Sequence, residues 1–140
     1  MTKYKKIYIA GVLTVVEKDQ RNFYKQISLL CNSLGAEAYV PHIWGTDPIV
    51  NPDVEPSEVW RINHRRVNDS DLVIAYIGQP SLGVGAELEM ARVNNIKIIL
   101  WWFKDEIVSR MALGNPAVIK TIKIKTQQEL FTKLKNILKK

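Results

Sequence analysis

The chain has 140 residues and 46% hydrophobic residues, which is the size and composition of one globular domain. No apolar run approaches the ~20 residues that a membrane-spanning helix needs, and the single cysteine, Cys31, can form no internal disulfide. The net charge of +6 comes largely from lysines near the two ends, without a basic stripe interleaved with aromatic residues. We therefore expect one domain over residues 1–140, in the reducing cytoplasm, with neither a membrane nor a nucleic acid polymer as partner.

The first half of the chain predicts two short strands, one helix and one long loop. A strand at 7–10 ends at Gly11, and a helix over 19–34 shows apolar residues at helical spacing. A second strand is expected at 37–40. Residues 41–56 contain four prolines and predict a long loop, and long loops in compact domains are often functional.

The second half predicts three further strands, each followed by a helix. The elements are, in order, a helix capped by Ser57 and ending near Asn68, a strand at 71–77, a helix ending near Asn94, a strand at 97–102, a short helix at 106–112, a strand at 121–124, and a last helix opened by the capping box at 126–129.

This alternation predicts an α/β fold. The strands are near-continuous apolar runs, which indicates a five-stranded parallel sheet with helices on both faces, a flavodoxin-like or Rossmann-like three-layer sandwich. In such folds ligands bind at the carboxyl ends of the strands. The loops after Ala10, Val40, Ile77 and Trp102 are therefore the candidate site.

Residues 80–91, PSLGVGAELEMA, form a glycine-rich segment that leads into a predicted helix. A dinucleotide-binding fingerprint would follow the first strand and carry a third glycine where Leu88 stands. The chain also lacks a phosphate-loop Lys-Ser/Thr pair, acidic residues after the first strand, and clusters with metal-ligand spacing. We expect neither a metal nor a cofactor.

The two glutamates of this segment differ in what they can do. Glu87 lies close to the helix start, where the helix dipole favours an ionised carboxylate, the form that a nucleophile needs. Glu89 is turned roughly 200° around the helix, so the two carboxylates cannot share one substrate atom. The alternative is that both glutamates simply favour the helix start and face solvent.

The segment QPSLGVGAELEMA (79–91) closely resembles the signature of the nucleoside 2-deoxyribosyltransferase superfamily, and is nearest its 2'-deoxynucleoside 5'-phosphate N-hydrolase branch. Matches at Ile7–Gly11, Asp71–Ala75 and Val108–Met111 extend the resemblance over most of the chain. Members of this family break or exchange the N-glycosidic bond of a deoxynucleoside.

The resemblance implies a role for each matching residue. Glu87 matches the nucleophile that attacks the anomeric carbon, and Tyr8 matches the tyrosine that orients that carboxylate. Ser81 matches a serine that binds the 5'-phosphate. Ser109 matches a phosphate-binding serine that reaches into the neighbouring subunit's site, which implies a homodimer. The resemblance also implies substrate contacts at three glycines, Gly11, Gly83 and Gly85.

The chain departs from the family pattern at two positions. Where the family has an aspartate that contacts the sugar and handles protons, this chain has Asn63, and an amide cannot act as an acid or base. The neighbouring His64 can titrate but is turned about 100° away. A further phosphate-binding serine of the hydrolases is replaced by Val12, and Thr14 is a candidate to take its place.

Three functions remain open from the sequence. The first is an N-glycosidase for (deoxy)nucleoside 5'-monophosphates, favoured by Ser81 because a hydroxyl accepts a phosphate without repulsion. The second is a nucleoside 2-deoxyribosyltransferase. The third is a non-catalytic nucleotide-binding module, suggested by Asn63. The indoles of Trp44 and Trp60 either stack on the base or anchor the long loop.

Overall fold

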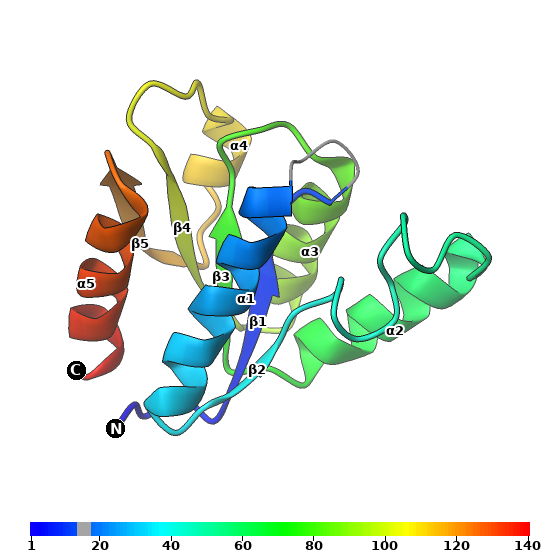
Figure 1. Cartoon of the computed structure of the whole chain (residues 1–140), viewed down its shortest axis with the longest axis horizontal. Helices are drawn as coiled ribbons and strands as arrows, with labels where there is room; N and C mark the ends of the chain where they lie inside the picture. Colours follow the sequence, from blue (N-terminus) through cyan, green and yellow to red (C-terminus); the bar gives the residue numbers. More distant parts are fainter. Residues whose placement is uncertain (14–17) are drawn as a thin grey trace.

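The computed structural model describes residues 1–13 and 18–140, and its centre is a parallel sheet with the strand order β2-β1-β3-β4-β5 (Figure 1). The strands are β1 (Lys6–Ala10), β2 (Glu37–Tyr39), β3 (Leu72–Tyr76), β4 (Lys97–Phe103) and β5 (Val118–Ile124). Every neighbouring pair is parallel. The predicted five-stranded α/β fold is confirmed.

Helices cover both faces of this sheet. They are α1 (Lys18–Ser33), α2 (Pro56–Asn68), α3 (Leu82–Val93), α4 (Arg110–Leu113) and α5 (Gln127–Leu138). Side chains of α1 and α5 share one buried cluster with one face of the strands. Those of α2 and α3 share a second cluster with the opposite face. This is the three-layer arrangement that the apolar strands predicted.

The central strand β3 is buried along its whole length, which explains its uninterrupted apolar sequence. Neighbouring residues of a strand point to opposite faces, so Ile74 lies in the α1/α5 cluster and Ala75 in the α2/α3 cluster. On β1 the same alternation directs Tyr8 toward α2 and α3. Burial of such side chains contributes roughly 25 cal/mol per Å² of apolar surface.

Three predicted boundaries differ from the structure by more than one residue. Helix α2 begins at Pro56 with Glu55 as its cap, so Ser57 is a helical residue and not the cap, because proline suits the first helical position. The short helix α4 begins at Arg110 and not at 106. Strand β5 begins at Val118 and not at 121. As an edge strand in which only Ile122 and Ile124 are buried, β5 lacks the continuous apolar run of β3 and β4.

The start of α4 is displaced because Glu106 is engaged elsewhere. Its carboxylate accepts hydrogen bonds from the backbone N–H of Phe103, at 2.7 Å, and from the Tyr76 hydroxyl. A methyl group added at Gly78 would lie 2.1 Å from this carboxylate, so a larger residue there would displace Glu106 from these hydrogen bonds. These contacts join the loops that follow β3 and β4.

The predicted long loop is confirmed between β2 and α2 (Figure 1). It is tied to α1 by a buried ion pair between Arg21 and Asp47. Asp47 also accepts a hydrogen bond from the backbone N–H of Ile49 at 2.8 Å, and Gly45 turns the chain with a φ of +95°. The loop is thus held over the carboxyl edge of the sheet.

The strand order changes direction between β1 and β3. The chain runs from β1 outward to β2, then crosses back to β3 on the other side of β1. In parallel sheets of this order, the crevice at such a switch point is the usual ligand site. None of the helices formed by the described residues has the length and apolarity to span a membrane.

Candidate active site

Glu87 of α3 and Tyr8 of β1 meet at the switch point. The Tyr8 hydroxyl donates a hydrogen bond to the Glu87 Oε2 atom, and both side chains are buried. Glu87 is 8% exposed, although it is a carboxylate. The alternative that Glu87 faces solvent is therefore wrong, whereas Glu89 is exposed and pairs with Arg92.

Burial has a larger effect than the helix dipole on the pKa of the Glu87 carboxyl. Removal from water raises the pKa of its carboxyl to about 7, and the Tyr8 hydrogen bond acts in the lowering direction. Glu87 is the sixth residue of α3, in its second turn, where the dipole has faded. The expectation that the helix start keeps this carboxylate fully ionised is wrong.

Two further aromatic rings continue outward from Tyr8. Tyr39, the last residue of β2, is the register partner of Tyr8 and stacks on it with ring centroids 5.4 Å apart. Trp44 of the long loop follows, with its centroid 5.9 Å from that of Tyr39. The Arg66 guanidinium of α2 lies over both Tyr39 and Trp44, at 4.9 and 5.8 Å from their centroids.

Asn63 lies on α2, where it faces the long loop. Its Oδ1 atom is 3.5 Å from the Thr46 hydroxyl, at the limit of a hydrogen bond. Thr46 itself donates to the Pro41 carbonyl at 3.0 Å. His64 instead stacks on Trp60, with ring centroids 4.4 Å apart. The tryptophans differ accordingly: Trp44 adjoins the Tyr8–Tyr39 stack, and Trp60 pairs with His64.

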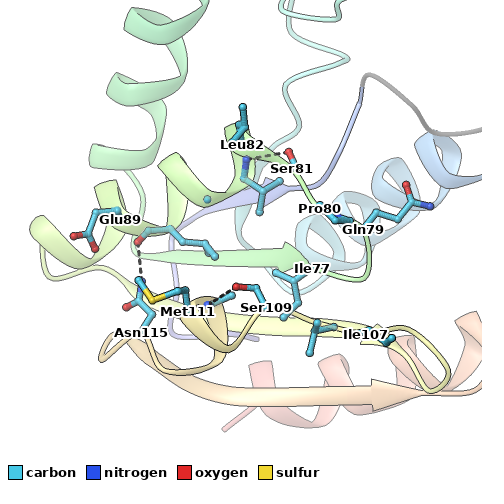
Figure 2. Close-up of a pocket in the computed structure, with 15 residues that line it drawn as sticks. Ile77, Gln79, Pro80, Ser81, Leu82, Glu89, Ile107, Ser109, Met111 and Asn115 are labelled. Carbon is cyan, nitrogen blue, oxygen red and sulfur yellow. Dashed lines mark hydrogen bonds between the residues drawn. The ribbon is translucent and has the colours of Figure 1, made fainter.

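Ser81 and Ser109 line one groove of about 810 Å³ between α3 and α4 (Figure 2). Each serine caps a helix: the Ser81 hydroxyl accepts from the backbone N–H of Val84, and the Ser109 hydroxyl from that of Ala112, both at 3.2 Å. Glu87 is not among the lining residues, because its carboxylate meets Tyr8 of β1 in the sheet. The groove and the buried carboxylate are separate features of α3.

The glycines of the opening segment are helical. Gly83 and Gly85 lie in the first turns of α3 and not in a loop, which corrects the sequence-based interpretation. A methyl group at Gly85 would meet nothing within 4 Å, so this side of the helix is open beside the groove. Their predicted substrate contacts stay predictions.

Gly11 has a packing reason of its own. A methyl group there would lie 2.3 Å from the Tyr24 ring, whose hydroxyl donates to the Val12 carbonyl at 3.1 Å. The close packing of Tyr24 therefore requires glycine, and the predicted substrate contact of Gly11 stays a prediction. Thr14, the candidate phosphate ligand, lies outside the described residues.

Three residues of this region were not predicted from the sequence. The sequence pattern predicts Tyr39 only as a strand residue, whereas in the structure it ends that strand at the carboxyl edge of the sheet. Asp47 and Arg66 were not singled out. The rule that ligands bind where parallel strands end could have identified Tyr39, whereas the ring stack and the Arg21–Asp47 pair depend on contacts between distant segments.

No protein-family model matches the chain. Among curated proteins, the "Putative 2'-deoxynucleoside 5'-phosphate N-hydrolase 1" of Syntrophotalea carbinolica is 35% identical over 74 residues, which is 51% of this chain and 51% of that protein. The matched region thus spans about half the length of the curated relative. The resemblance inferred from the sequence is confirmed.

Solved structures agree at the level of the fold. The CMP N-glycosidase BcmB of Clostridium botulinum has a TM-score of 0.74 and 20% identity, with coverage of 96% of this chain and 100% of that one. The 2-deoxyribosyltransferase of Bacillus psychrosaccharolyticus has a TM-score of 0.66 and 16% identity, with 90% of each chain covered. At these identities the two structures show that the chain shares their fold.

Proposed function

We propose that this protein is an N-glycosidase that cleaves (deoxy)nucleoside 5'-monophosphates to free base and sugar phosphate. The observation that carries the proposal is the buried Glu87 carboxyl, hydrogen-bonded to Tyr8 at the switch point of the sheet. A buried carboxyl with no cation partner among the described residues is costly for stability, and perturbed carboxyls of this kind cluster at functional sites.

The chemistry would follow the double displacement of retaining glycosidases. In the first step, a Glu87 oxygen attacks the anomeric carbon as the bond from that carbon to the base nitrogen breaks. In the second step, a water oxygen attacks the same carbon and releases Glu87. Tyr8 holds the carboxylate in place through its hydrogen bond. The base leaves with one proton, and the sugar phosphate gains the water hydroxyl.

The 5'-phosphate would bind near the start of α3. The Ser81 hydroxyl accepts from the Val84 backbone, so its own O–H is available to donate to a phosphate oxygen. The helix start adds a favourable field for an anion. Ser81 precedes Glu87 by six residues, or about 9 Å along the helix, so the phosphate and the anomeric carbon would occupy different turns of α3.

The proposed active form is a homodimer in which Ser109 contributes to the neighbouring site. Large apolar side chains stand exposed beside the groove, with Leu82 96% exposed, Ile107 95% and Met111 88%. Soluble monomers rarely expose contiguous apolar surface of this kind. A second copy of the chain covering this surface would bring its own groove, and its own Ser109, close to Ser81.

Mixing two variants tests the shared site. In a mixed dimer of Glu87→Ala and Ser109→Ala chains, one of the two sites keeps both side chains if Ser109 acts across the interface. Co-refolding the two proteins should then restore about a quarter of the wild-type rate, because half of the dimers are mixed. No gain over Ser109→Ala alone would show that Ser109 acts within its own subunit.

The principal experiment is base release from a panel of deoxynucleoside monophosphates and the matching nucleosides, measured by chromatography. We expect release from monophosphates in preference to nucleosides, with loss of activity in Glu87→Ala. Glu129→Ala is the control, because Glu129 is a partly exposed carboxylate on α5, across the sheet from the proposed site, where it pairs with Lys133. Undiminished base release by Glu87→Ala would show that Glu87 is not the nucleophile.

Two alternatives give different results in the same assay. A 2-deoxyribosyltransferase, suggested by the structural similarity to such an enzyme, would form an exchanged nucleoside or nucleotide when an acceptor base is added. A non-catalytic nucleotide-binding module, suggested by Asn63, would raise its melting temperature with nucleotide and release no base.

A further inference from the structure

The Tyr39 hydroxyl is a buried polar group without a hydrogen-bond partner among the described residues. The ring is fixed by its stack on Tyr8 and by the Arg66 guanidinium above it. A buried hydroxyl left without a partner costs about 1–3 kcal/mol, and native proteins keep few of them. Such a group, held rigidly beside a reactive carboxyl, points to a partner that arrives with the substrate.

The surroundings of this hydroxyl are those of the proposed reaction centre. Tyr39 and Tyr8 are register partners on adjacent strands, so both side chains lie on the face that Glu87 occupies. Burial raises the pKa of the Tyr39 phenol, the Arg66 charge opposes the rise, and the Glu87 carboxylate adds to it. The Thr46 hydroxyl is close enough to oppose the rise as well, but it donates its proton to the Pro41 carbonyl and makes no hydrogen bond of acceptable geometry with Tyr39. The phenol therefore stays protonated at neutral pH and can donate.

The reaction requires such a donor. Unless it is protonated, a nucleobase leaves as an anion, and the Asn63 amide has no acidic proton to give. Asn63 lies on α2 near Thr46. This part of the site therefore contains an amide in place of a carboxyl group that could protonate the base. Neither His64, stacked on Trp60, nor the Tyr8 hydroxyl, engaged with Glu87, fills this role.

We propose that Tyr39 is a catalytic residue whose hydroxyl protonates the departing base. This inference rests on the proposed N-glycosidase function. In the first step the bond from the anomeric carbon to the base breaks, the electron pair stays on the base nitrogen, and the Tyr39 proton moves to the base. In the second step water attacks the glycosyl-Glu87 carbon and returns a proton to the Tyr39 phenolate. The net reaction consumes one water molecule.

The base would reach Tyr39 from the side of the long loop. Trp44 and Arg66 cover the Tyr39 ring, and Trp44 is 54% exposed, so its indole is the side chain nearest to solvent in the stack. A planar base can replace part of this stack because it offers the same kind of aromatic face. The entering base then excludes water from the site, which strengthens the hydrogen bond that Tyr39 donates.

Tyr39→Phe removes only the hydroxyl and keeps the stacked ring. Base release should be compared for two nucleotides that differ in the need for a proton. If purines are accepted, the pair is dGMP and 7-methyl-dGMP, whose cationic base leaves as a neutral molecule. If pyrimidines are accepted, the pair is the accepted nucleotide and its 5-fluoro derivative, whose base is a more stable anion. Tyr4→Phe, a buried tyrosine near the amino end of β1, is the matched control.

We expect Tyr39→Phe to lower kcat for the ordinary nucleotide by about 100-fold or more, the usual effect of a general acid. For the activated nucleotide the loss should be at least about tenfold smaller, and Tyr4→Phe should leave both rates near wild type. An equal loss on both nucleotides, or no loss on either, overturns the proton-donor role while base release by the wild type still supports the proposed function. If the wild type releases base from no nucleotide, the proposed function fails, and the role of Tyr39 fails with it.

Discussion

Replacement of Glu87 by glutamine should stabilise the protein in a pH-dependent manner. The folded state raises the pKa of this carboxyl from 4.5 to about 7 because the group is buried. An acid with a raised pKa favours folding while it is protonated, and this advantage is lost as the pH rises from 4.5 through 7. Glutamine is neutral throughout and can still accept the Tyr8 hydrogen bond, so the variant escapes this loss.

The size of the effect follows from the two pKa values. At about 1.4 kcal/mol per pH unit, their difference corresponds to about 3.5 kcal/mol of unfolding free energy. The stability difference between Glu87→Gln and wild type should therefore be smallest near pH 4.5, grow between pH 5 and 7, and level off near pH 8. Base release by Glu87→Gln should be abolished, so the variant should be more stable than wild type but inactive.

Urea unfolding of both proteins, followed by tryptophan fluorescence at several pH values from 4.5 to 8.5, measures this difference directly. Other titrating groups affect both proteins equally and cancel. Glu89→Gln serves as the control, because Glu89 is exposed and its substitution should give no comparable rise between pH 5 and 8. The argument that burial raises the pKa of Glu87 would be refuted by either of two results. The difference in unfolding free energy between Glu87→Gln and wild type would not change with pH, or it would fall as the pH rises.

Three further substitutions test Tyr8 and two of the glycines. Tyr8→Phe removes the hydrogen bond that lowers the pKa of Glu87, so the acid limb of the kcat/KM profile should move to higher pH; an unchanged limb would contradict this role. Gly11→Ala places a methyl group 2.3 Å from the Tyr24 ring and should cost about 1–3 kcal/mol in urea unfolding, and a wild-type midpoint would show that the ring yields freely. Gly85→Ala meets no neighbour and should raise helix stability by up to about 1 kcal/mol, yet lower base release if substrate or a second copy occupies that space. Unchanged kinetics would mean that the space beside Gly85 stays free during the reaction.

Local sequence patterns determined the order of the elements and the main candidates of the site. Continuous apolar runs such as that of β3 indicate strands buried on both faces, and their alternation with helices leaves few topologies. The segment around Glu87 identified the carboxyl, and the first-strand match identified Tyr8. The structure brings these two residues together, although they are 79 positions apart in the chain.

Features that depend on burial or on contacts between distant segments were decided only by the tertiary structure. The sequence suggested that Glu87 is ionised by a helix start, but enclosure between α3 and the sheet raises its pKa instead. Tyr39 belongs to the candidate site because β2 pairs with β1 and places the Tyr39 ring against the ring of Tyr8. Propensity and spacing describe one segment at a time, whereas desolvation and packing depend on what the rest of the chain places around each side chain.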